Sequence, residues 1–131
     1  MKLQSYATLK RKMDKVFSEY VRRRHADADG TVACVCCGNR KHWKKMQAGH
    51  FVTRTRMTTR WDLENCAPQC GKCNVLLRGN AVGYAHYLVN RYGQDIFARL
   101  RDKSALVVKY SRRELRALIE ECETRAKAIG A

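Results

Sequence analysis

Two Cys-x-x-Cys pairs are the residues whose types and spacing most directly imply chemistry. Cys34 and Cys37 form the first pair, and Cys70 and Cys73 form the second. Such a turn brings two thiolates to one side of a tight loop, and two turns complete the tetrahedral shell of a Zn²⁺ ion. Because four thiolates leave no open position for water or substrate, we expect a structural zinc ion.

The remaining three cysteines are weaker candidates for the metal shell. Cys36 and Cys66 are competing ligands, but neither forms a Cys-x-x-Cys pair with another cysteine. Cys122 falls on the apolar stripe of a helical pattern, so we expect a small buried hydrophobic residue. An odd total of seven cysteines argues against a disulfide framework. The alternative to a zinc site is a set of unrelated buried or redox-active thiols.

A lone histidine, His50 in the stretch QAGHF, lies between the two pairs and is not needed by a zinc ion that already has four thiolates. Asn65 precedes the second pair, and Asn74 follows it directly. A neutral imidazole can act as a general base that takes a proton from an attacking water. An asparagine carbonyl can accept from the imidazole N–H and orient the ring. The alternative is a histidine that only packs, with asparagines that serve ordinary loops.

The elements that must position these residues begin with an amphipathic helix. Apolar residues recur at spacings of three and four from about Ser5 to His25, which predicts a basic helix that stops at the sequence ADADG. Residues 31–79 have only short apolar runs and need a metal to hold them. We expect short strands around VACVCCG and QAGHFVT in that segment.

Helical patterns return after residue 79. The stretches NAVGYAHYLVNRY and QDIFARLRDK predict two helices separated by Gly93, and ALVVKY is expected to be extended. A last helix is predicted over SRRELRALIEECETRAKAIG, where Ser111 and Glu114 have the spacing of a capping box. The length of 131 residues and the 45% hydrophobic composition suit one domain.

The charge of the chain limits its class of partner. Lys and Arg number 27 against 12 Asp and Glu, which gives a formal net charge of +15 and a pI near 9.9. An excess this large attracts polyanions, and nucleic acid is the usual one. We expect no membrane partner and a cytoplasmic location, because no apolar run could span a bilayer and no signal peptide is recognisable.

Several pieces of the sequence together resemble the NinG, or Rap, family of phage recombination endonucleases. They cover most of the chain from about Leu9 to Lys103, and they read KVFSEYVRRR, QAGHF, ENCAPQCGKCN, RGN and YAHYLVNRYGQD. The order His, Asn, Cys-x-x-Cys-Asn is also that of the HNH nucleases, known as ββα-metal or His-Me finger nucleases. Cysteine pairs with an asparagine after the last cysteine are similar to the phage endonuclease VII resolvases.

This resemblance implies both a fold and an activity. The fold would be α+β: a zinc-stapled ββα-metal core over residues 31–79, flanked by a basic N-terminal helix (1–30) and C-terminal helices (80–131). The activity would be metal-dependent cutting of branched DNA, including Holliday junctions and D-loops. It would serve the recombination of a phage or prophage in the bacterial cytoplasm.

The resemblance also implies site residues, with one departure. His50 would be the general base, Asn74 a ligand of the catalytic Mg²⁺ or Mn²⁺, and Asn65 the middle asparagine of the motif. Many HNH enzymes have a metal-binding Asp or His just before the base, where this chain has Gly49. Another ligand is therefore needed, and the candidates are His86, Asn80, Asp62 and Glu64.

Cations near these residues are predicted to contact DNA phosphates and not to read bases. They are Arg54, Arg56 and Arg60 after His50, and Lys72 and Arg78 around Asn74. The alternative for each is a merely solvated loop residue. Because a junction needs two coordinated cuts, a symmetric dimer through the long terminal helices is an accompanying hypothesis. Two rival functions stay open: a non-catalytic zinc module that binds nucleic acid, and an HNH nuclease of homing or restriction type that cuts linear duplex.

Overall fold

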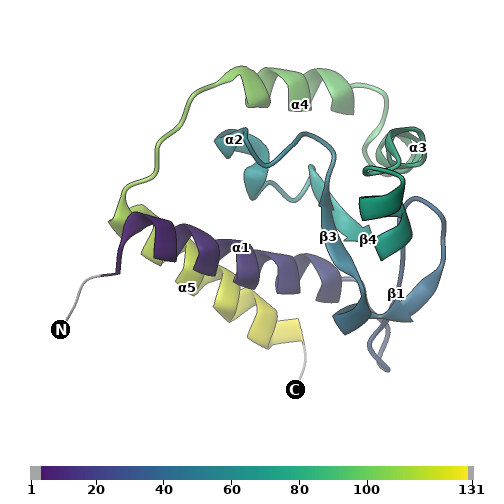
Figure 1. Ribbon diagram of the computed structural model, residues 1–131, viewed down its shortest axis with the longest axis horizontal. Helices are drawn as coiled ribbons and strands as arrows, with labels where there is room; N and C mark the ends of the chain where they lie inside the picture. The colour runs from purple at the N-terminus through teal and green to yellow at the C-terminus, as the bar shows by residue number, and fades with distance from the viewer. Residues whose placement is uncertain (1–3, 130–131) are drawn as a thin grey trace.

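Helices surround two small antiparallel sheets in the computed structural model, which describes residues 4–129 (Figure 1). The prediction of an α+β fold is therefore confirmed. None of the described helices is both long and apolar enough to cross a bilayer. In chain order the elements are α1 (Tyr6–Arg23), β1 (Thr31–Ala33), β2 (Arg40–His42), the 3₁₀ turn η1 (Trp43–Lys45), β3 (Gln47–His50), α2 (Met57–Arg60), β4 (Cys66–Gln69), the π-helical turn η2 (Lys72–Leu76), α3 (Ala81–Tyr92), α4 (Ile96–Ala105) and α5 (Arg112–Ile129).

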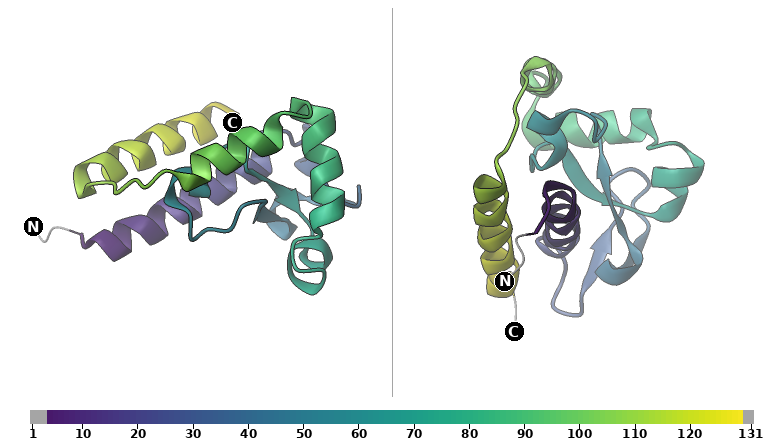
Figure 2. Two further views of the ribbon diagram at one scale, coloured as in Figure 1. Left: turned by 90° about the horizontal axis from the view of Figure 1, so that it is seen from above. Right: turned by 60° about the vertical axis from the view of Figure 1, so that its left-hand side comes forward.

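The first and last helices lie side by side and share one apolar core (Figures 1 and 2). Phe17 of α1 packs in the same cluster as Leu115 and Cys122 of α5, so the predicted burial of Cys122 is confirmed. The predicted capping box is confirmed too, because Ser111 and Glu114 each donate a backbone N–H to the other's side chain at 3.0 Å. Since the two apolar faces meet within one chain, a dimer through these helices would have to use their polar outer faces. Gly130, at the end of the predicted helix, lies outside the described residues.

The strands form two hairpin-like pairs. In one sheet β1 pairs with β2, and in the other β3 pairs with β4, with His50 opposite Cys66. The predicted strands around VACVCCG and QAGHFVT correspond to β1 and β3. Their partners β2 and β4 were not predicted, because β2 is exposed throughout and β4 is buried throughout, so neither shows apolar alternation.

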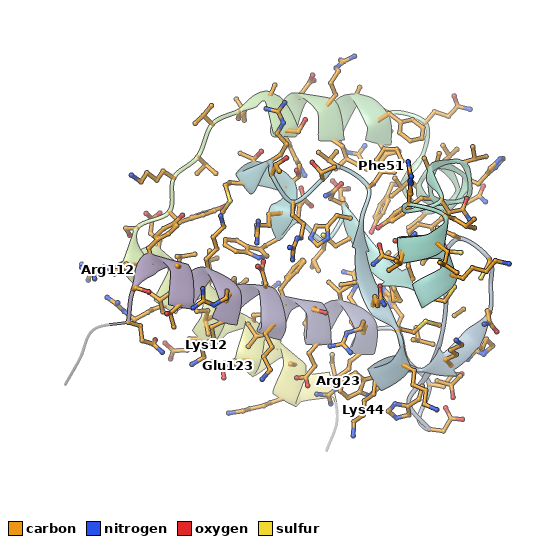
Figure 3. All side chains as sticks on the ribbon, in the orientation of Figure 1. Lys12, Arg23, Lys44, Phe51, Arg112 and Glu123 are labelled. Carbon is orange, nitrogen blue, oxygen red and sulfur yellow. The ribbon has the colours of Figure 1, made fainter. Side chains whose placement is uncertain are left out.

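Helices α3 and α4 cover the β3–β4 sheet on the side away from α1. Phe51, which follows β3, points into this layer (Figure 3) and packs against Tyr84 and Phe97 with ring centroids 5.6 and 5.7 Å apart. The hydroxyl of Tyr84 donates to the carbonyls of Gly49 and Asn65. This contact ties α3 to both strands.

The segment ALVVKY, predicted to be extended, is not helical beyond Ala105, and Leu106 has extended backbone angles, but the segment forms no regular strand. Ala105 ends α4, and the residues after it form a connection to α5 that pairs with no strand among the described residues. Val107 is 99% exposed. The β-branched composition of the segment therefore does not produce a strand, because no neighbouring backbone is available for pairing.

Candidate functional site

The four thiols of the two Cys-x-x-Cys pairs converge on one point. The sulfur atoms of Cys34, Cys37, Cys70 and Cys73 all lie within 4.8 Å of one another, and the Cys37 and Cys70 sulfurs are 3.7 Å apart. A regular tetrahedron with Zn–S bonds of about 2.3 Å has sulfur atoms about 3.8 Å apart. The predicted cluster is thus confirmed as a group that could hold a structural metal such as zinc.

The backbone around the cluster favours the thiolate form of Cys34. The first pair lies on the turn after β1, where Gly38 has a φ of +77° that suits a glycine. Burial opposes ionisation of Cys34, but hydrogen bonds from the backbone at Cys70, Cys37 and Cys36 lower its pKa to about 7. A thiol that is already easy to deprotonate is a good zinc ligand.

The two competing cysteines lie outside this cluster. Gln69 donates its amide nitrogen to the Cys36 sulfur at 3.0 Å, and burial raises the pKa of Cys36 to about 11. Cys66 contacts the carbonyl of Arg60 at 3.6 Å, and burial also raises its pKa. Neither sulfur belongs to the group of four that lie within 4.8 Å of one another, so the geometry favours the ligand set of the two Cys-x-x-Cys pairs.

His50 and Asn74 line one cleft between α1 and β3. The cleft has a volume of about 350 Å³. Its walls are formed by Asp14, Phe17, Ser18, Ala48, His50, Thr53, Arg54, Trp61 and Asn74. The structure thus brings together three of the predicted site residues, His50, Asn74 and Arg54, in a polar depression.

The orientation of His50 is set by one backbone contact. Its Nε2 lies 2.8 Å from the carbonyl oxygen of Arg60. Because a carbonyl can only accept, Nε2 must carry the proton, and Nδ1 then holds the lone pair. Burial lowers the pKa of His50 below its ordinary value; the nearby Arg54 charge acts in the same direction, while the Arg60 carbonyl opposes it. The imidazole is therefore neutral at neutral pH, as a general base must be.

Asp14 of α1 holds the residue that orients His50. Arg60 donates through Nε and Nη2 to the two oxygens of Asp14, and the Trp61 indole donates to the same carboxylate at 2.9 Å. Burial acts against ionisation, yet these hydrogen bonds leave the pKa of Asp14 lowered. The sequence analysis missed Asp14, since it lies 46 residues from Arg60 in a helix that shows only a basic outer face.

This ion pair corrects one predicted DNA contact. The Arg60 side chain is only 11% exposed and is committed to Asp14 and to the carbonyl of Arg54. Arg60 therefore serves the interior of the site and does not face solvent. By contrast, Arg54, Arg56, Lys72 and Arg78 are all exposed, as phosphate contacts require.

The two asparagines have different positions. Asn65 is fully buried, and its amide binds both backbone groups of Val52 and the carbonyl of Thr59. It closes the loop between β3 and β4, while the Arg60 carbonyl takes the place predicted for an asparagine at the imidazole. Asn74 lines the cleft and donates its Nδ2 to Gln47 at 2.6 Å. Because Nδ2 is used in that bond, the other atom of the amide, Oδ1, is the one that can accept or bind a cation.

The structure also explains Gly49. A Cβ atom at this position would lie 1.7 Å from the Oε1 atom of Gln69, whose side chain is fully buried across the strand. No Asp or His can occupy the position without displacing Gln69. The buried Gln69 amide donates to the carbonyl of Gly79 at 2.8 Å. The departure at Gly49 is thus built into the packing between β3 and β4.

None of the four candidate extra ligands lines the cleft. His86 is exposed on the outer side of α3. Asn80 caps α3 and donates to the Cys73 sulfur at 3.6 Å. Asp62 and Glu64 both accept from Lys103, at 2.9 and 3.1 Å. Among the described residues that form the cleft, Asp14 is the one carboxylate.

Comparisons with known proteins agree with the resemblance seen in the sequence. The model of the family described as Bacteriophage Lambda NinG protein matches residues 1–131. Two relatives, each named Protein ninG, come from Escherichia phage 933W and Enterobacteria phage VT2-Sa and are 34% identical over 70 residues. That match covers 53% of this chain and 34% of each relative, so the matched part spans about a third of their length. No solved structure is similar enough to count as a match.

Proposed function

The chain belongs to the Bacteriophage Lambda NinG protein family, and from its cleft we infer a metal-dependent endonuclease that cuts DNA at branched recombination intermediates. Holliday junctions and D-loops are the expected substrates. The observation that carries the proposal is the neutral, oriented imidazole of His50 beside Asn74 in a strongly basic protein. We further propose that β3, β4 and η2 form a ββα-metal core of the HNH type.

The chemistry follows from the orientation of the ring. Nδ1 of His50 accepts a proton from the attacking water while the new oxygen–phosphorus bond forms and the bond to the leaving oxygen breaks. The Arg60 carbonyl holds the Nε2 proton, so the ring accepts only at Nδ1. Arg54, exposed at the cleft, would position the neighbouring phosphate.

The cleft residues suit a hard divalent cation of the Mg²⁺ or Mn²⁺ kind. Such ions prefer oxygen ligands and commonly keep several waters, with few protein ligands and substrate phosphates completing the shell. Asn74 Oδ1 is the proposed protein ligand, and Asp14 contributes the nearest negative charge lining the cleft. When bound, the cation would stabilise the charge on the leaving oxygen.

A cleavage assay tests this proposal. A labelled four-way junction and a linear duplex of matched sequence are incubated with Mg²⁺, Mn²⁺ or no added metal. We expect junction-selective cutting that requires metal and that falls by roughly 10²–10⁴-fold in His50→Ala. His86→Ala is the matched control, because this histidine is exposed on α3, away from the cleft.

The outcomes separate the rival functions. Tight binding with no cleavage, identical in wild type and His50→Ala, would make the protein a non-catalytic zinc module. Equal cutting of junction and duplex would instead indicate a nuclease of homing or restriction type. Either result would overturn the proposed branched-DNA endonuclease.

A further inference from the structure

Three consecutive apolar side chains project from the protein directly after Asn74. Val75, Leu76 and Leu77 are 60, 77 and 48% exposed, although each would be favourable in a core. Exposed large apolar residues in a contiguous run mark interaction sites more often than chance placement does. Val75 and Leu76 belong to η2, the turn that also carries Asn74, and Leu77 directly follows it.

The backbone that presents this run is held by hydrogen bonds next to the cysteine cluster. Leu77 donates its N–H to the carbonyl of Lys72 at 2.8 Å, and Gly79 donates to the carbonyl of Cys73 at 2.9 Å. The carbonyl of Gly79 in turn accepts from the buried Gln69 amide. The turn that follows has positive φ angles at Arg78, Gly79 and Asn80. The apolar run is thus an ordered projection and not a frayed loop.

The charges around the run indicate its partner. Lys72 precedes it and Arg78 follows it, and both side chains are exposed. Between Glu64 and Asp95 the sequence contains no acidic residue. An apolar projection with cationic flanks complements a partner that is anionic outside and apolar inside. Stacked base pairs between two phosphate backbones have this arrangement.

We propose that Val75, Leu76 and Leu77 form an apolar wedge that enters the base stack at the branch point of the DNA. Lys72 and Arg78 would bind the phosphates on either side. Inserting side chains between base steps costs unstacking energy. That cost is smallest where pairing is already disturbed, so the wedge would favour branches over linear duplex. The inference rests on the proposed nuclease function, and it assigns the choice of substrate to a part of the protein distinct from His50.

Fluorescence of 2-aminopurine at the centre of a four-way junction tests the wedge. Binding is measured without added divalent metal on His50→Ala protein, so that cleavage plays no part. We expect the wild-type wedge to raise the fluorescence by unstacking the probe. The double variant Val75→Ser/Leu76→Ser should abolish the rise and weaken junction binding by about tenfold, with duplex binding unchanged. Val107→Ser is the matched control, since Val107 is also a solvent-exposed apolar residue but lies on the connection between α4 and α5.

Two results would overturn the wedge. One is unchanged junction binding and fluorescence in the double variant. The other is a dimeric mass in light scattering without DNA that the double variant converts to a monomer, because the run would then be a subunit interface. Failure of the nuclease proposal appears separately, as wild-type protein that binds the junction but cuts nothing with Mg²⁺ or Mn²⁺.

Discussion

The helical pair and the cysteine-rich half of this molecule are stabilised in different ways. Leu9, Phe17 and Leu115 are among the side chains that bury an apolar core between α1 and α5. The buried cluster around β1 contains three cysteines among its five fully buried members, and the strands of this half are three or four residues long. The first region can be stabilised by apolar burial, whereas we expect the second to depend on a metal held by its four clustered thiols.

The proposed catalytic cleft lies where these two regions meet. His50 comes from β3, Asn74 follows the second cysteine pair, and Asp14 comes from α1. The Asp14–Arg60 ion pair joins the regions and fixes the carbonyl that orients His50. The geometry of the proposed catalytic cleft therefore depends on both means of stabilisation, and we expect that each can be removed by substitution while the other is kept.

The largest effect is expected from removing the metal. Cys70→Ser takes one thiolate from the shell, and structural zinc sites contribute about 10–16 kcal/mol of apparent folding free energy. We expect the variant to hold less than about half a zinc per chain, to cut no DNA, and to lose structure around the cleft. Metal analysis and amide hydrogen exchange measure this, and exchange in α1 and α5 should stay slow.

Cys36→Ser is the matched control for that experiment. Cys36 lies next to a ligand in sequence, but its sulfur contacts Gln69 and not the cluster. We expect the variant to bind one zinc per chain, the same content that we expect of the wild type. Loss of zinc from Cys36→Ser, or retention of it in Cys70→Ser, would contradict the ligand set.

A smaller effect is expected from a cavity in the helical core. Leu115 is fully buried between α1 and α5, so Leu115→Ala should lower the free energy of unfolding by about 2–5 kcal/mol. Zinc content should remain that of the wild type, because no thiol is affected. Urea unfolding measures the first quantity and metal analysis the second. If zinc were lost along with stability, the two regions would form one cooperative unit.

This difference also explains what the sequence could predict. The cysteine cluster, α1 and the Ser111–Glu114 cap depend on short, regular spacings, and all three are confirmed by the structure. Neither β2 nor β4 shows apolar alternation. Helices α1 and α5, by contrast, each bury one face, so their apolar residues recur at helical spacing and both helices could be predicted.

The parts of the site that were missed involve residues far apart in the chain. The contact of Asp14 with Arg60 joins α1 to a loop beyond β3, and neither residue has a local pattern that distinguishes it from other charged residues. Because of the same contact, the Arg60 side chain, which was expected to bind DNA, is only 11% exposed and pairs with Asp14. Gly49 was recognised as a departure, but its reason lies in the Gln69 side chain on the neighbouring strand.

The smallest expected effect is a shift in the pH dependence of cleavage. In the proposed mechanism His50 acts as a base only when neutral, and burial together with the Arg54 charge lowers its pKa below the ordinary 6.5. Activity should therefore persist below pH 6.5 and fall as the pH drops through the lowered pKa. Arg54→Gln removes a positive charge that disfavours the imidazolium, so the pKa should rise and activity should fall at a higher pH than in the wild type. Single-turnover cleavage rates over a pH series measure the midpoint.

Asp14→Asn should move this midpoint in the opposite direction. The Asp14 carboxylate raises the pKa of His50, so its removal lets that pKa fall further and extends activity to lower pH. The rate at the plateau should also decrease, because Arg60 loses the partner that fixes its carbonyl. Midpoints that shift the same way in both variants would show that the titrating group is not His50. Opposite shifts would indicate that Asp14, from the helical region, and Arg54, from the loop after β3, act with opposite sign on the pKa of one catalytic imidazole.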